Sequence, residues 1–148
     1  IREFMKLFEN DTELENADPL IRAITNLMWV ASRMRDEPLP EEDKDEKVNL
    51  PRYMENYTFA RSVAAKRLPE LKLYPSVDLS ADLSNAEISL GDPYDDMGDI
   101  YCDLLGVQRQ IDAGAPQEAR WQYRWGFENH WGKHASELLL YLISDHRF

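Results

Sequence analysis

The amino-acid sequence predicts an all-α fold, a single-domain helical bundle over residues 1–148 with about four main helices. Two Asp-Pro pairs, at 18–19 and 92–93, supply the aspartate and the proline that favour the start of a helix. Apolar residues follow each pair with a period of 3.6 residues. A short connection at 114–115 separates the last two periodic segments, and such connections join antiparallel neighbours. The last two helices are therefore expected to form an antiparallel hairpin.

The N-terminal third contains one strong helix signal. Residues 1–9 predict one or two helical turns, and the helix that begins at Asp18-Pro19 is expected to run to about Arg35. Its apolar stripe consists of Leu20, Ile21, Ile24, Leu27, Met28, Ala31 and Met34. Residues 36–47 contain two prolines among closely spaced acidic and basic side chains, so they predict an exposed loop.

The middle of the chain predicts a second long helix followed by an irregular connection. The helix is expected to begin near Asn49 and to end before Pro69. Its expected apolar face consists of Tyr53, Met54, Tyr57, Ala60, Ala64 and Leu68. Residues 69–91 alternate weakly, but no second strand is evident for pairing, so they predict an extended connection that lies over the helices.

The last two helices are marked by signals at both ends. The third helix begins at Asp92-Pro93 and is expected to run to about Ala113, with Gly114 at the position after the cap. The fourth is expected to run without interruption from Ala115-Pro116 to about Ser144.

Charge and composition restrict the class of partner. The formal net charge of −11 argues against duplex nucleic acid and against an anionic membrane surface, and it leaves a basic protein or a cation. The longest apolar run, Leu138 to Ile143, is far shorter than the roughly 20 residues that cross a bilayer. Cys102 is the only cysteine, which excludes an intrachain disulfide and favours a reducing, cytoplasmic location.

Acidic side chains concentrate on the third helix. Five of its aspartates, Asp92, Asp95, Asp96, Asp99 and Asp103, lie opposite its apolar stripe, so one interpretation is a solvated acidic face. The alternative is that they face the last helix. In an antiparallel hairpin joined at 114–115, Asp99 is level with His130, and Asp95 is level with His134. The last helix also carries a packing seam, which consists of Arg120, Arg124, Phe127, Trp131, His134, Leu138 and Tyr141.

Two chemistries fit an internal cluster. The first is a structural network in which arginines and histidines pair with carboxylates; losing one buried partner would then cost about 3–5 kcal/mol. The second is a divalent-metal site formed by Asp95, Asp99, His130 and His134, because both pairs have the four-residue spacing of helical ligands. Two imidazoles and two carboxylates suit zinc, manganese or iron. The whole constellation is Asp95, Asp96, Asp99, Asp103, Arg120, Arg124, His130 and His134.

Several segments together resemble a known family. They are Leu68 to Tyr74, the run of residues 91–104 with its Asp-Asp-x-x-Asp-Ile sequence, residues 121–127, and the His-Trp-Gly-Lys-His run at 130–134. In this order and spacing they resemble the bacterial family described as domain of unknown function 5063, over about residues 50–143. The resemblance implies a soluble bacterial protein, and it brings no established activity, cofactor or catalytic residue.

The sequence leaves two functions open. The first is a non-enzymatic binding or regulatory module for a protein partner, with the loop at 36–47 and the aromatic-rich last helix as contact surfaces. The second is a divalent-metal-dependent, phosphohydrolase-like helical enzyme that uses the four proposed ligands. In that enzyme the metal would activate water, with Asp96 or Glu128 as the base. The substrate and the oligomeric state remain open.

Overall fold

The computed structural model describes residues 1–34, 50–77 and 88–145. Within these ranges it contains six helices and one two-stranded sheet, so the predicted helical class is confirmed. The elements in chain order are α1 (Arg2–Lys6), α2 (Asp18–Arg33), α3 (Leu50–Arg67), β1 (Tyr74–Val77), β2 (Ile88–Gly91), α4 (Pro93–Asp112), α5 (Pro116–Asn129) and α6 (Trp131–Asp145). The predicted acidic loop at 36–47 lies outside the described residues.

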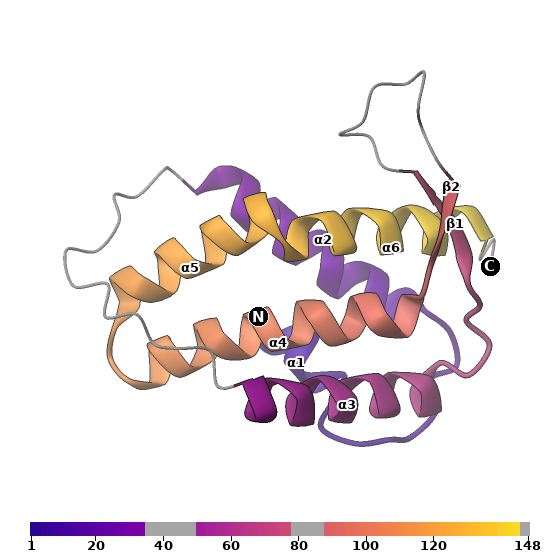
Figure 1. Cartoon of the computed structure of the whole chain (residues 1–148), viewed down its shortest axis with the longest axis horizontal. Helices are drawn as coiled ribbons and strands as arrows, with labels where there is room; N and C mark the ends of the chain where they lie inside the picture. Colours follow the sequence, from indigo (N-terminus) through magenta and orange to yellow (C-terminus); the bar gives the residue numbers. More distant parts are fainter. Residues whose placement is uncertain (35–49, 78–87, 146–148) are drawn as a thin grey trace.

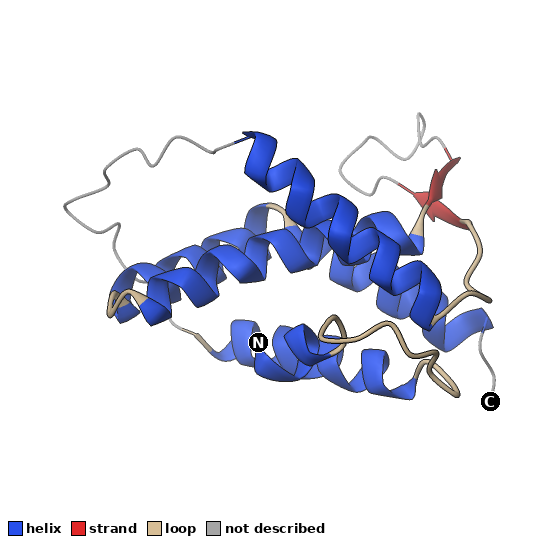
Figure 2. Ribbon diagram, turned by 90° about the horizontal axis from the view of Figure 1, so that it is seen from below, coloured by secondary structure: helices blue, strands red, loops and turns tan. Residues whose placement is uncertain are grey.

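Helix α4 occupies the middle of the bundle. It runs between α3 on one side and α5 and α6 on the other, and α1 contacts it as well (Figure 1). Seen from below, α2 lies across the bundle from α3 (Figure 2). The α4–α5 hairpin is therefore antiparallel, as predicted, and α4 has neighbouring helices on two sides.

The ends of α4 follow from local chemistry. The side chain of Asp92 accepts a hydrogen bond from the backbone N–H of Tyr94 at 2.9 Å, which is the predicted cap. At the other end Gly114 adopts a φ of 75°, and the N–H of Ala115 bonds the carbonyl of Gln110 at 2.9 Å. A left-handed residue in this position favours glycine, so both predicted ends are confirmed.

Apolar faces predicted from periodicity form most of the core. The fully buried side chains of α2, α4 and α6 pack together; the largest are Leu20, Ile24, Met97, Ile100, Leu104, Trp131, Leu138 and Leu142. On α3, Ala60, Ala64 and Leu68 are buried as predicted, but Met54 is 48% exposed, so that part of the predicted face was wrong. Helix α2 begins at Asp18 itself and its N-cap residue is Ala17, so the predicted cap at Asp18 was wrong.

The prediction of one uninterrupted last helix was wrong. Helix α5 ends at Asn129 and α6 begins at Trp131, because His130 adopts non-helical angles of φ −147° and ψ −84°. At this break the first turn of α6 lies against the end of α5. A Cβ atom on Gly132 would lie 2.0 Å from the carbonyl oxygen of Phe127, so the contact requires glycine. The break changes which side chains of the two segments face α4.

The prediction that residues 69–91 lack a strand was also wrong. Strands β1 and β2 pair in antiparallel register, Tyr74 opposite Gly91 and Val77 opposite Ile88, so each supplies the partner that the other appeared to lack. The hairpin is anchored by Tyr74, whose buried ring stacks on Tyr141 at 4.7 Å. Tyr141 also accepts a hydrogen bond from the backbone N–H of Lys72 at 2.9 Å. Residues 78–87, which join the strands, are outside the described ranges.

Candidate functional site

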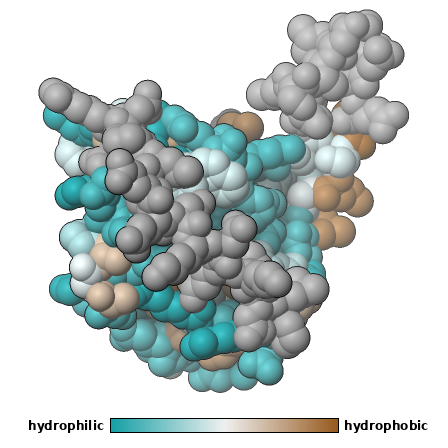
Figure 3. Space-filling view, turned by 60° about the vertical axis from the view of Figure 1, so that its left-hand side comes forward, coloured by the Kyte–Doolittle hydropathy of each residue, from teal (hydrophilic) through white to brown (hydrophobic). Residues whose placement is uncertain are grey.

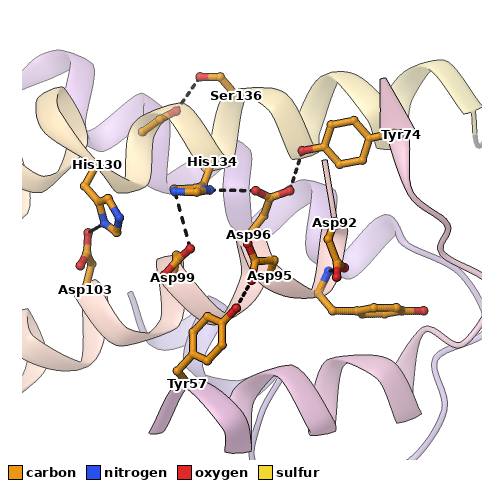
Figure 4. A network of polar contacts seen from close by, with 12 residues as sticks. Tyr57, Tyr74, Asp92, Asp95, Asp96, Asp99, Asp103, His130, His134 and Ser136 are labelled. Atoms are coloured by element: carbon orange, nitrogen blue, oxygen red, sulfur yellow. Dashed lines mark hydrogen bonds and ion pairs between the residues drawn. The ribbon is translucent and has the colours of Figure 1, made fainter. Parts of the chain in front are cut away.

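Four aspartates of α4 meet two histidines where α4 faces the α5–α6 break. Figure 4 shows Asp95, Asp96, Asp99 and Asp103 along α4, with His130 and His134 reaching toward them from the opposite helix. We call these six residues the His–Asp cluster. Its carboxylates point into the helix interfaces, so the interpretation of a solvated acidic face does not describe them.

The most buried contact joins Asp96 to His134. Asp96 is 4% exposed, and its Oδ1 lies 2.8 Å from Nδ1 of His134. Its Oδ2 accepts a hydrogen bond from the hydroxyl of Tyr74 at 2.5 Å, so the hairpin reaches the cluster as well. The hydrogen bond to Asp96 raises the pKa of His134, against the opposing effect of burial. The other ring nitrogen, Nε2, is 3.6 Å from Oδ2 of Asp99.

A second pair lies about two turns farther along α4. Nδ1 of His130 is 2.8 Å from Oδ2 of Asp103, and this hydrogen bond raises the pKa of His130. The imidazole of His130 is 40% exposed, more than that of His134 at 24%, so the cluster opens to solvent on this side. The two rings meet edge to face, with centroids 5.1 Å apart.

Tyrosines of α3 hold the other aspartates from the opposite side. The hydroxyl of Tyr53 donates to Oδ1 of Asp99 at 2.9 Å, and the hydroxyl of Tyr57 donates to Asp95. Burial, and then the negative charges of Asp99 and Asp96, raise the pKa of Asp95. Burial followed by the charge of Asp99 raises the pKa of Tyr53. Each aspartate of the cluster therefore has a hydrogen-bonding partner.

Sequence reasoning missed the tyrosines. Tyr53 and Tyr57 were assigned to an apolar face, and Tyr74 to a connection without a partner. The available signal was the four-residue spacing of Tyr53 and Tyr57, which places both on one helix face. In addition, a buried tyrosine hydroxyl needs a hydrogen-bond partner.

The predicted pairing of the histidines was wrong. His130 bonds Asp103 rather than Asp99, and His134 bonds Asp96 rather than Asp95. The prediction assumed a continuous last helix, whereas the break at His130 changes the position of the ring that follows α5. Asp95 instead faces α3 through Tyr57.

The contacts described for Arg124 are to elements other than the His–Asp cluster. Arg124 donates to the backbone carbonyl of Ala31 at 2.7 Å and pairs with Glu128 one turn along its own helix, which ties α5 to α2. Arg120 lies on the exposed side of α5.

Three members of the cluster lie close enough together to bind one metal ion. Asp99, His130 and His134 each offer a ligand atom, and these atoms all lie within 4.8 Å of one another. Asp95, the fourth member of the set predicted from the sequence, is not in this group. Two imidazoles and one carboxylate form a donor set that suits zinc, iron or manganese.

The raised pKa values predict a pH dependence for the protein kept metal-free with chelator. Protonated histidine is favoured in the folded state, so this contribution is fully present below the ordinary pKa of 6.5 and is lost as pH rises through the folded-state values. We expect the free energy of unfolding to decrease over that interval. Urea unfolding across pH should show the decrease in the natural protein and a flatter profile in the double variant His130→Gln, His134→Gln. Equal slopes would contradict the prediction.

Comparison with known proteins gives a family without an assigned activity. The model of the family described as a domain of unknown function (DUF5063) matches residues 1–144, which confirms the resemblance and extends it over α1 and α2. No curated protein and no solved structure matches the chain significantly. Among the described residues, no helix has both the length and the apolar character needed to cross a bilayer.

Proposed function

The chain belongs to the DUF5063 family, a domain of unknown function. From its exposed apolar surface we propose that it is a binding module that docks a protein partner. The contact surface in this proposal is the apolar face of the β-hairpin together with the adjoining end of α6. The observation that carries the proposal is the outward face of the hairpin, where the described large side chains are apolar and strongly exposed.

The hairpin has one face toward the helices and one face toward solvent. Tyr74 marks the inner face, and alternation along the strands places Pro75 and Leu90, which pair with one another, on the outer face. Ile88 and Leu90 are 77% and 71% exposed, and Leu73, just before β1, is 59% exposed. The polarity is therefore the reverse of the usual arrangement, in which the outer face of a half-buried sheet is polar.

The proposal includes the end of α6 in this surface. Leu140 and Ile143 are 68% and 58% exposed, and their neighbour Tyr141 stacks on Tyr74 of the hairpin. Figure 1 shows the hairpin crossing the C-terminal part of α6, and in Figure 3 brown apolar residues gather at the right-hand edge of a largely teal surface. Exposed apolar patches with a polar rim are typical of protein-interaction sites.

The chemistry of the chain indicates the kind of partner. In the described sheet β1 and β2 pair only with one another, so an extended segment can add to an outer edge through backbone hydrogen bonds. The net charge of −11 favours a partner with basic residues around an apolar centre. The outer face would supply the apolar contacts. The backbone hydrogen bonds at the strand edge would fix the orientation of the bound segment.

Site-directed photo-cross-linking tests this proposal. With the cross-linker at position 90 of the chain expressed in its own cells, we expect a discrete partner band that is absent with the cross-linker at position 111. Ile111 is the matched control because it is also apolar and 45% exposed, on α4. Against the purified partner, Ile88→Lys should weaken binding about tenfold or more, as loss of a central interface residue does, whereas Ile111→Lys should not.

Two outcomes would contradict the docking surface. One is that positions 90 and 111 capture the same set of proteins, which indicates non-selective contact. The other is that Ile88→Lys keeps full affinity while its circular dichroism spectrum and melting temperature match those of the natural chain. A cross-link only to a second copy would indicate self-association instead.

A second candidate function is divalent-metal-dependent hydrolysis, which is favoured by the grouping of Asp99, His130 and His134. A bound metal would lower the pKa of a water ligand. The two bases predicted from the sequence have other partners: Asp96 is held by His134 and Tyr74, and Glu128 pairs with Arg124. The cluster thus offers ligands for a metal ion more clearly than it offers a general base for hydrolysis. For this reason we rank hydrolysis as the second candidate function.

A further inference from the structure

We propose that Asp99, His130 and His134 bind one divalent transition-metal ion, and that Asp96, Asp103 and Tyr53 orient these three ligands. This site is independent of the docking surface, so either proposal can fail without the other.

The spacing of the ligand atoms fits a site that closes slightly around an ion. Metal–ligand bonds of about 2.0–2.2 Å in tetrahedral or octahedral geometry place neighbouring ligand atoms about 3–3.5 Å apart. Nε2 of His134 and Oδ2 of Asp99 are 3.6 Å apart, which is too long for a hydrogen bond but close to that value. All three ligand atoms fall within 4.8 Å. Small changes in side-chain torsion angles would bring these atoms to ligand spacing.

The tautomers are set by the carboxylates behind the rings. An ionised carboxylate only accepts hydrogen bonds, so Nδ1 of each histidine carries the proton that points to Asp103 or Asp96. In the neutral imidazole Nε2 then holds the lone pair. Histidines that ligate metals almost always donate their other N–H to a carboxylate, carbonyl or water in this way. Here both histidines have this arrangement, on two different aspartates (Figure 4).

The third ligand is held in the same manner. Tyr53 donates its hydroxyl to Oδ1 of Asp99, which leaves Oδ2 on the side of His134. A structural network needs each carboxylate to have a partner, but it does not need two imidazoles and one carboxylate oxygen to converge. This convergence is what distinguishes a metal centre from a set of helix-bridging hydrogen bonds.

The donor set and the exposure indicate the type of ion. Imidazole nitrogens favour zinc, iron, cobalt or nickel over magnesium and calcium, which prefer all-oxygen sites. Three protein ligands and a 40% exposed His130 leave the remaining positions to water or to an added ligand. Cys102 is not a ligand: burial raises the pKa of its thiol to about 12, and its sulfur faces the carbonyl of Tyr53.

Metal titration of chain purified without a histidine tag and stripped with chelator tests the site. Zn²⁺ and Co²⁺ should each bind with one equivalent per chain and with a dissociation constant of about 1 µM or lower. Bound Co²⁺ should give visible d–d absorption without the sulfur-to-metal charge-transfer band of a thiolate ligand. The melting temperature should rise at saturating Zn²⁺.

Variants separate ligands from their supports. His130→Gln and Asp99→Asn should weaken binding by about 100-fold or more. Asp103→Asn, which removes only the support of His130, should weaken it about 10- to 100-fold. The matched control is Asp112→Asn, an exposed aspartate at the far end of α4, which should bind as the natural chain does. Because His130 is the most exposed member, His130→Gln keeps the test valid if His134→Gln fails to fold.

The proposal is overturned if no saturable binding appears with Zn²⁺, Co²⁺, Fe²⁺ or Mn²⁺. It is also overturned if folded His130→Gln and Asp99→Asn bind as tightly as Asp112→Asn, because the ion would then lie elsewhere. A Co²⁺ spectrum with thiolate charge transfer would exclude the assigned ligands.

Discussion

Replacing Asp96 with alanine is expected to lower the free energy of unfolding of the metal-free chain by about 3–5 kcal/mol, the range for losing one partner of a buried charged pair. Asp96, on α4, is 4% exposed. Its carboxylate joins this helix to β1 through the hydroxyl of Tyr74 and to α6 through the ring of His134. Alanine leaves both partners without their acceptor in a low-dielectric interior. Urea unfolding followed by circular dichroism measures the loss.

The matched control is Asp112→Ala on the same helix. Asp112 is exposed and bonds only Gln108 among its described contacts, at 2.9 Å, so its loss should cost less than about 1 kcal/mol. A double-mutant cycle of Asp96→Ala with Tyr74→Phe should give a coupling energy of about 0.5–3 kcal/mol. An Asp96→Ala cost as small as that of the control would mean that the pair is effectively solvated.

Replacing Trp131 with alanine is expected to cost about 3–5 kcal/mol as well, through loss of buried apolar area and the cavity left behind. Trp131 is fully buried at the first position of α6. Its ring lies 5.1 Å from those of both Tyr123 and Phe127, and its indole N–H donates to the carbonyl of Tyr123 at 3.2 Å. It thus packs α6 back onto α5 across the break.

The control for this substitution is Trp125→Ala, because Trp125 is 49% exposed and stacks on Trp121 on the outside of α5. We expect its cost to be about 1 kcal/mol or less, as for most surface substitutions. The two variants are compared by urea unfolding at the same pH. Similar costs at the two positions would contradict the role of Trp131 as the link across the break.

Local signals in the sequence were sufficient to locate α2, α3 and α4, but not the break between α5 and α6. An aspartate followed by proline provides a cap and a suitable φ angle within one turn, which is why the start of α4 was predictable. Gly114 ends the same helix through its own backbone freedom. The apolar period then determined which faces of α2 and α4 form the core, and the family resemblance depended on the same local runs.

Tertiary structure alone decided the contacts on which function depends. Whether His130 meets Asp99 or Asp103 depends on a single non-helical residue, since one helical turn moves a side chain by about 5.4 Å. At the break Gly132 allows α6 to approach the backbone of Phe127, a contact that forms only in the folded chain. Pairing of β1 with β2, and the tyrosine hydroxyls that reach Asp95, Asp96 and Asp99, likewise join residues 11 to 46 positions apart. Periodicity reports which side of a helix is buried, but not which side chain of a distant segment will lie opposite.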